Sequence, residues 1–198
     1  MDDIVVTGNN PVEQAALKKY LSSEFEMKDV GFLKYFLGIE VLRCKSRIFL
    51  SQRKYVHDLL EETGMSACKP IATPLAEGMK LGIDQNQVPV EKGRYQRLVG
   101  RLMYLAHTRL DLAHALSVVS QYMHNPEEQH ISAVMRILSY LKGSLGKGIL
   151  FRKNGHFRIE CYTDADWVGS TDDRRSTYGY FTFVGGNIVT WRTRSKML

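Results

Sequence analysis

The order of apolar and polar residues predicts a helix near the start of the chain. In "NPVEQAALKKYLSSEF" apolar residues recur at spacings of three and four, so the helix has one apolar side that we expect to be buried. Asn10 can cap this helix and Pro11 fits its first position. The preceding "DDIVVTGNN" has β-branched residues that run into a Gly-Asn turn, which predicts the exit strand of a hairpin.

Two strands and a second helix follow. "FLKYFLGIEVLRCKSRIFLSQ" predicts two apolar-rich strands around a basic turn that runs from Arg43 to Arg47. "QRKYVHDLLEETGM" has helical spacing and stops at Gly64, a residue typical of helix C-termini. Residues 68–90 hold three of the five prolines and show little periodicity, so we expect a linker there.

Three amphipathic helices and a set of strands are predicted after the linker. The helices lie within residues 91–146 and carry apolar stripes at Leu98, Leu102, Leu105, Leu112, Leu116, Val119, Met123, Ile131, Val134, Leu138 and Leu141. The period then changes to strand-like alternation in "GILFRK", "HFRIECYTD", "YGYFTFVG" and "NIVTWRT", with hairpin chemistry in "GGN". The whole pattern predicts an α+β fold.

The composition is that of a globular protein. Of the 198 residues, 44% are hydrophobic and 24% are charged. No apolar run reaches the roughly 18 residues of a membrane-spanning helix, and "MDDIVV" lacks the basic start of a signal peptide. The three cysteines are widely spaced, which argues against a disulfide framework. These features predict an intracellular protein, cytoplasmic or nuclear.

Positive charge gathers toward the end of the chain. Residues 142–198 contain ten lysines and arginines against five acids, and the rest of the chain is almost neutral. Such a surface suits a polyanion, although a basic face that serves only solubility is an equally open reading. The candidate nucleic-acid contacts lie in the basic turn and in "DDRRS", namely Arg43, Lys45, Arg47, Arg174 and Arg175.

Four aspartates stand close together in "YTDADWVGSTDDRRSTYGY". Like charges at this density need water, neighbouring arginines or a divalent cation to offset them. Alternation places Asp164 at the end of a strand, where its carboxylate can face a bound cation. Asp172 and Asp173 follow in a loop, and we expect them to pair with the arginines beside them.

A second acidic site is formed by Asp2 and Asp3. A pair of acids at a chain end is frayed by default. Here the pair precedes a β-branched strand and a turn, so it is expected at the tip of a hairpin. Adjacent carboxylates on such a tip can hold metal ions for phosphoryl transfer.

Over nearly its whole length the chain resembles the reverse transcriptase and ribonuclease H region of a copia-type retrotransposon Pol polyprotein. The resemblance rests on the order of the segments above together with "CKPIATPL", "YQRLVGRLMYLAHTRLDLAHALSVVSQYMHNP" and "RILSYLKGS". It implies a palm and primer-grip-like part in residues 1–67, a linker in 68–90, a helical connection in 91–146, and the first strands of a truncated ribonuclease H-like domain in 147–198.

The resemblance also implies roles for single residues. Asp2 and Asp3 match the paired polymerase acids, and Asp164 matches the first metal-binding aspartate of ribonucleases H. Mg²⁺ is the implied cofactor, and an RNA–DNA hybrid or other nucleic acid is the implied partner, bound without sequence preference. Each metal site keeps only part of the family's ligand set, so the chain is expected to be catalytically incomplete on its own, with weak Mg²⁺ binding.

Three functions therefore remain open: a working polymerase or nuclease, a non-catalytic nucleic-acid-binding module, and an inert or domesticated relic of a mobile element. For the last of these, Phe181 and Phe183 fall on one face of a predicted strand. If no helix covers this face, a partner is expected to cover it.

Overall fold

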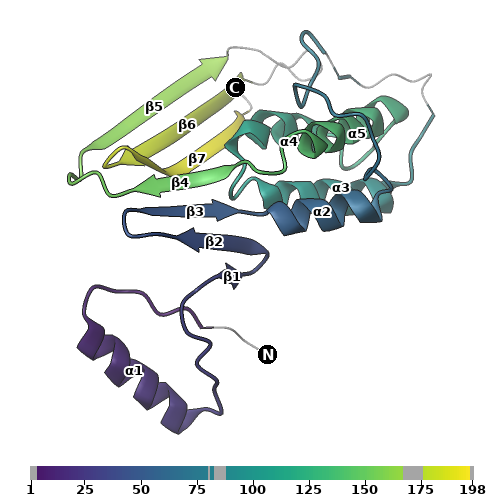
Figure 1. The fold of residues 1–198 in the computed structure, drawn as a ribbon. Coiled ribbons are helices and arrows are strands. Elements are labelled where there is room, and N and C mark those ends of the chain that lie inside the picture. The colour runs from purple at the N-terminus through teal and green to yellow at the C-terminus, as the bar shows by residue number, and fades with distance from the viewer. Residues whose placement is uncertain (1–3, 80, 83–87, 167–175, 197–198) are drawn as a thin grey trace.

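The computed structural model describes residues 4–79, 81–82, 88–166 and 176–196 and is an α+β protein with two antiparallel sheets (Figure 1). The described helices are α1 (Pro11–Glu24), α2 (Arg53–Glu62), α3 (Lys92–Leu105), the 3₁₀ turn η1 (Leu110–Leu112), α4 (Ala113–Ser120) and α5 (Glu128–Lys142). The described strands are β1 (Tyr35–Phe36), β2 (Ile39–Arg43), β3 (Arg47–Ser51), β4 (Gly148–Arg152), β5 (Ile159–Asp166), β6 (Ser176–Val184) and β7 (Asn187–Lys196). None of the described helices is long and apolar enough to cross a membrane.

The predicted N-terminal helix is confirmed, but its predicted burial is wrong. Asn10 caps α1 through a 3.1 Å hydrogen bond from the backbone N–H of Val12, and Pro11 opens the helix. No residue of α1 is buried, and Val12 is 77% exposed. Figure 1 shows α1 standing apart from both sheets and from the other helices, so its apolar side lacks a packing surface in the described part of the chain.

The strand expected in "DDIVV" is also absent from the described residues. Residues 4–7 have no regular structure, because none of the described strands pairs with them. A lone strand without a neighbour leaves its backbone groups to water and is not stable by itself. Asp2 and Asp3 lie outside the described residues.

The predicted pair of strands around the basic turn is confirmed and gains a third partner. β2 and β3 are antiparallel, with Val41 opposite Leu50. β4 then pairs with the free side of β3, which gives a four-stranded sheet in the order β1-β2-β3-β4. The approach is close at Gly148, where an added Cβ would lie 2.2 Å from the carbonyl oxygen of Leu50, so this position requires glycine.

The three helices predicted after the linker are confirmed and form the core together with α2. The stripe leucines of α3 and α5 are almost wholly buried, as is Tyr95, whose hydroxyl donates a 2.7 Å hydrogen bond to the carbonyl of Val119. Residues 68–79 have no helix or strand. The connection nevertheless lies on the helices, since Leu81 is buried and its carbonyl accepts a 2.6 Å hydrogen bond from Tyr122.

A buried cation ties the end of the core to the start of β4. The side chain of Arg109 is 2% exposed and donates two hydrogen bonds, of 2.9 and 2.8 Å, to the carboxylate of Asp111. It also donates to the backbone carbonyl and the hydroxyl of Ser144. Tyr140 donates a 2.5 Å bond to Asp111, and Lys147 donates to the Tyr140 hydroxyl. This network ends one residue before β4 begins.

Replacing Asp111 by asparagine is expected to destabilise the fold. A neutral amide at this position could not neutralise the Arg109 guanidinium, and an uncompensated buried charge is costly, so Asp111→Asn should lower the free energy of unfolding by about 2–3 kcal/mol. Urea denaturation followed by circular dichroism measures this difference. Asp58→Asn removes an exposed pair with Lys54 and serves as the control, with an expected loss of at most about 1 kcal/mol.

The same network predicts a pH dependence. Burial alone would raise the pKa of Asp111, but the hydrogen bonds from Arg109 and Tyr140 and the charge of Arg109 outweigh it and lower the pKa to about 2. A lowered folded-state pKa contributes stability above the unfolded-state value, and that stability is lost as the pH falls. The stability gap between the wild type and Asp111→Asn should therefore shrink from about pH 4 to pH 2. A constant gap would contradict the assignment.

Candidate functional site

Of the predicted acidic cluster, Asp164 is the member whose side chain the structure describes. Asp164 lies on β5 opposite Gly179 of β6, and its side chain is solvent-exposed. The prediction that Asp164 ends its strand is wrong, because pairing with β6 continues to Asp166. Asp172, Asp173, Arg174 and Arg175 lie outside the described residues.

The described residues do not by themselves fit a two-metal site. Within residues 4–79, 81–82, 88–166 and 176–196, no three His, Cys, Asp or Glu side chains are grouped so that they could hold a metal ion. Mg²⁺ sheds its waters reluctantly and is bound tightly only where several anionic oxygens converge. Asp164 supplies one carboxylate, which is too few to hold two Mg²⁺ ions.

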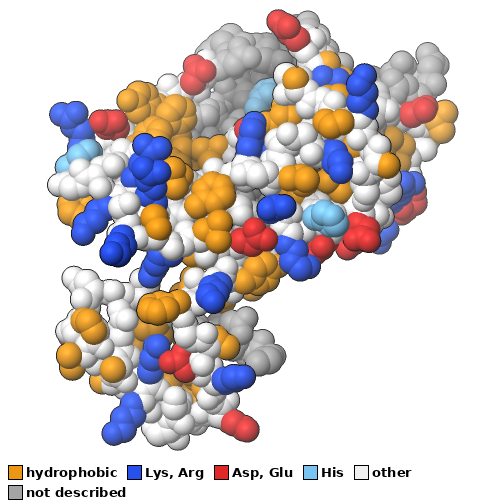
Figure 2. Space-filling model, viewed as in Figure 1, with side chains coloured by type: hydrophobic (Ala, Val, Ile, Leu, Met, Phe, Trp, Pro, Cys, Tyr) orange, Lys and Arg blue, Asp and Glu red, His pale blue; other side chains and the backbone are white. Residues whose placement is uncertain are grey.

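Basic side chains from two distant segments meet at one end of the first sheet. The turn between β2 and β3 lies beside the end of β4. The backbone N–H of Lys153 there donates a 3.1 Å hydrogen bond to the carbonyl of Ser46 in the turn. Figure 2 shows lysine and arginine side chains gathered at this end of the molecule. We name this surface the basic end; its residues are Arg43, Lys45, Arg47, Arg152 and Lys153, and all are exposed.

The basic end places like charges against one another. Arg47 and Arg152 are directly opposite in the β3–β4 ladder, so their side chains leave the same face of the sheet. Like charges in such cross-strand pairs are destabilising. None of the ion pairs found among the described residues involves either arginine. An anion bound at this surface would relieve the repulsion.

The positive field also reaches a cysteine in the turn. Cys44 is exposed, and its pKa lies below its usual value because of hydrogen bonding at the Ser46 backbone, with a smaller contribution from the charge of Arg47. The thiolate, which is the reactive form, is therefore favoured at this position. Cys44 is consequently a chemical probe placed inside the basic end.

Sequence reasoning identified the turn but missed its partners. Arg43, Lys45 and Arg47 were predicted from their clustering, and the structure places all three at the basic end. Arg152 and Lys153 belong to the same surface only because β4 pairs with β3. Strand pairing between segments this far apart leaves no mark in local periodicity, so the spacing of residues could not have revealed them.

The second sheet carries an aromatic face, formed by Tyr162, Phe181 and Phe183. Tyr162 stacks on Phe181 with ring centroids 5.2 Å apart, and Phe183 meets Phe181 edge-on at 5.8 Å. Tyr162 remains 50% exposed and Phe181 40% exposed, so the helices leave this face partly uncovered. On β7 the same face carries Trp191, whose indole N–H donates a 2.8 Å hydrogen bond to the carbonyl of Ala106.

The comparisons with known proteins agree on one family. Residues 1–77 match the model of the family described as reverse transcriptase (RNA-dependent DNA polymerase). The Pol polyprotein from the Arabidopsis thaliana transposon RE1 is 40% identical over 99% of this chain, which spans 13% of that polyprotein. The Pol polyprotein from the Nicotiana tabacum transposon TNT 1-94 is 40% identical over 98% of the chain, which spans 15% of it.

A shorter relative covers almost the same stretch. An uncharacterized mitochondrial protein from Arabidopsis thaliana is 38% identical over 99% of this chain, and the chain spans 81% of its length. No solved structure matches the chain significantly. The order of segments, the reverse transcriptase match and these relatives together identify the chain as a member of the copia-type retrotransposon Pol polyprotein family.

Proposed function

We propose that this chain is a nucleic-acid-binding part of the Pol polyprotein and that it holds the phosphate backbone at the basic end. One observation carries the proposal: five exposed cations from the β2–β3 turn and the end of β4 converge on one surface. Neighbouring strands lie roughly 5 Å apart, so cations on β3 and β4 act together on the same few phosphates. An RNA–DNA hybrid is the polyanion that fits the family best.

Binding of this kind is expected to be independent of sequence. Lysine and arginine side chains that neutralise phosphates position a duplex without reading its bases. Such contacts release counterions, so the affinity falls steeply as salt is added. A non-catalytic binding role is favoured over an inert relic because the opposed arginines Arg47 and Arg152 lower stability unless they meet an anion.

The family also suggests how the parts of the chain are used. In this proposal residues 1–67 belong to the palm and primer-grip region, 68–90 form a linker, 91–146 form the helical connection, and 147–198 begin a ribonuclease H-like domain. The match of residues 1–77 to the reverse transcriptase family supports the first of these. The pairing of β4 with β3 means that the last of these parts would share a sheet with the first.

Removing the charges of the turn should weaken salt-dependent binding. With a fluorescent RNA–DNA hybrid, the slope of log affinity against log salt should become shallower by about 2–3 in Arg43→Gln/Lys45→Gln/Arg47→Gln, because each lost phosphate contact removes about one unit. Fluorescence anisotropy from 50 to 300 mM salt, a range chosen around physiological ionic strength at about 150 mM, measures both the affinity and the slope. The matched control is Lys92→Gln/Arg94→Gln/Arg97→Gln, which removes three exposed charges at the start of α3.

Two results would decide the matter. Equal slopes for the two triple variants would show that binding follows net charge and not the basic end. As an independent readout, the bound hybrid should slow alkylation of Cys44 but not of Cys161, which is also exposed. Equal protection of both thiols would contradict the proposed surface.

Mg²⁺ enters the proposal through Asp2, Asp3 and Asp164. One exposed carboxylate leaves the ion most of its waters, so we expect a dissociation constant weaker than about 1 mM for Mg²⁺ at Asp164. Isothermal titration of the wild type and of Asp164→Asn tests this. Tight binding that disappears in Asp164→Asn, together with cleavage of a labelled hybrid in Mg²⁺, would instead favour a working nuclease.

We further propose that a polypeptide partner covers the aromatic face. Exposed aromatic side chains promote association, so Phe181→Gln should raise the protein concentration at which light scattering begins to increase. Tyr180→Gln is the matched control, because Tyr180 is 36% exposed on the same strand but leaves the opposite face of the sheet. An equal effect of the two substitutions would argue against a specific role for the aromatic face.

A further inference from the structure

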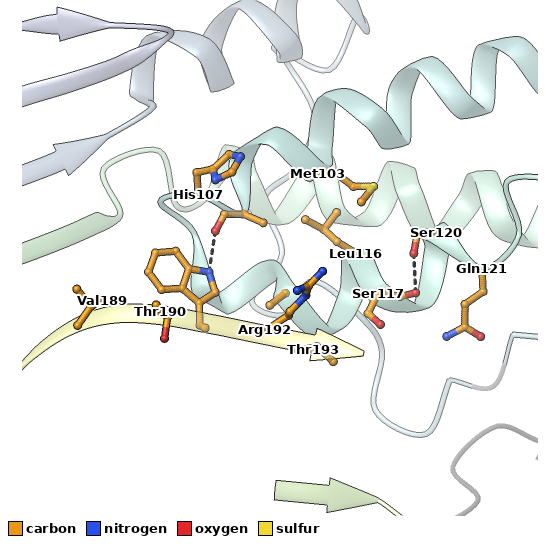
Figure 3. A pocket seen from close by; sticks show the side chains of 13 residues that line it. Met103, His107, Leu116, Ser117, Ser120, Gln121, Val189, Thr190, Arg192 and Thr193 are labelled. Atoms are coloured by element: carbon orange, nitrogen blue, oxygen red, sulfur yellow. Dashed lines mark hydrogen bonds between the residues drawn. The ribbon is translucent and has the colours of Figure 1, made fainter. Parts of the chain in front are cut away.

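A pocket of about 570 Å³ opens between the helices and the edge strand of the second sheet (Figure 3). This volume lies within the range of roughly 300–1,000 Å³ in which small molecules bind. The end of α3, one face of α4 and the middle of β7 form its walls. The residues that matter for its chemistry are Met103, Leu116, Ser117, Gln121, Trp191 and Arg192.

The inner wall of the pocket is apolar and contains a fixed aromatic ring. Leu116 is 3% exposed, and Met103 adds a polarisable side chain from α3. The hydrogen bond from the Trp191 indole to the carbonyl of Ala106 restrains the ring relative to α3. A restrained indole beside aliphatic side chains favours a flat, unsaturated ligand, which can pack on it with little loss of side-chain freedom.

The polar part of the pocket selects for negative charge. Among the described residues that line it, none is an aspartate or a glutamate. Arg192 is exposed, takes part in no ion pair among the described residues, and Figure 3 shows its guanidinium on the side of β7 that faces α4. Ser117 and Gln121 add uncharged hydrogen-bonding groups from α4 and its end.

We propose that this pocket binds one nucleotide unit, a planar heteroaromatic base that carries a phosphate. The base packs against Trp191 and Leu116, and the phosphate pairs with Arg192. A guanidinium is well suited to this role because it binds phosphate through two parallel hydrogen bonds. The unit can come from a free mononucleotide or from a nucleotide within a single strand.

The pocket is separate from the basic end. Asn187, at the start of β7, is hydrogen-bonded to Arg152, whereas Trp191 lies four residues further along the strand. Four residues of extended strand span roughly 14 Å. The inference therefore does not rest on the proposed function, and Arg43→Gln/Lys45→Gln/Arg47→Gln should bind a mononucleotide as the wild type does.

The indole N–H of Trp191 provides a direct readout in the full chain. In a ¹H–¹⁵N spectrum, with the signal assigned by Trp191→Phe, titration with adenosine monophosphate should shift the Trp191 signal to saturation. Adenosine and inorganic phosphate, tested separately, should each bind more weakly than the monophosphate. A short single-stranded oligoadenylate tests whether the pocket binds a nucleotide within a strand.

Two substitutions locate the contacts. Arg192→Gln should weaken the monophosphate about tenfold, the value expected for a lost hydrogen bond to a charged group, and leave adenosine unchanged. Arg94→Gln is the matched control, an exposed arginine at the start of α3 outside the pocket. Ser117→Leu places a larger side chain in the cavity and should weaken both ligands.

Each outcome has a defined meaning. A Trp191 shift by the monophosphate that depends on Arg192 supports a free nucleotide, and a shift by the oligonucleotide alone supports a nucleotide within a strand. If neither ligand moves the Trp191 signal, or if Arg192→Gln and Arg94→Gln bind the monophosphate equally, the proposal is overturned. If removing Arg43, Lys45 and Arg47 did not change the salt dependence of hybrid binding, the proposed function would fail, but the nucleotide titration of the pocket would keep its meaning.

Discussion

The antiparallel pairing of β3 with β4 is the constraint on which the rest of the structure depends. It joins a hairpin near the start of the chain to a strand that follows the whole helical core. Closing so long a loop costs conformational entropy, and the packed core between the two strands offsets that cost. The contact also tolerates no side chain at Gly148, where the backbone of Leu50 approaches most closely. The basic end exists only because this pairing forms.

The buried guanidinium of Arg109 also supports the pairing of β3 with β4, because it holds the segment that leads into β4. Its hydrogen bonds run to Asp111 and Ser144, and through Asp111 to Tyr140 and Lys147. These groups hold the end of α5 and the turn that leads into β4. A buried ion pair adds little net stability compared with an apolar core, but it fixes one arrangement because an unpaired charge is costly. The network therefore sets where β4 starts and, with it, which residues oppose β3.

Local patterns predicted most elements of this fold because local forces decide them. The spacing of leucines predicted α3 and α5, and the cap at Asn10 predicted the start of α1, since both depend on neighbours within a few residues. The burial of α1 was predicted wrongly. An apolar stripe indicates that a helix can pack against a surface, but it does not show that the fold provides one. The completion of the basic end by Arg152 was missed because it depends on strand pairing across the core. For Asp164 the pattern gave the correct strand but placed its end two residues early.

The two proposed anion sites are linked by β7, which is hydrogen-bonded to Arg152 of the basic end and forms one wall of the pocket. At the start of β7 the Asn187 side chain accepts from the backbone N–H of Arg152 and donates to its carbonyl, at 2.6 and 2.9 Å, which joins the second sheet to the first. Further along, the Trp191 indole joins the sheet to α3. β5 is joined to β7 through β6, which pairs with both. A strand held at two points keeps the basic end and the pocket at a constant separation, so a nucleic acid strand seated at one site meets the other at a defined distance along its backbone.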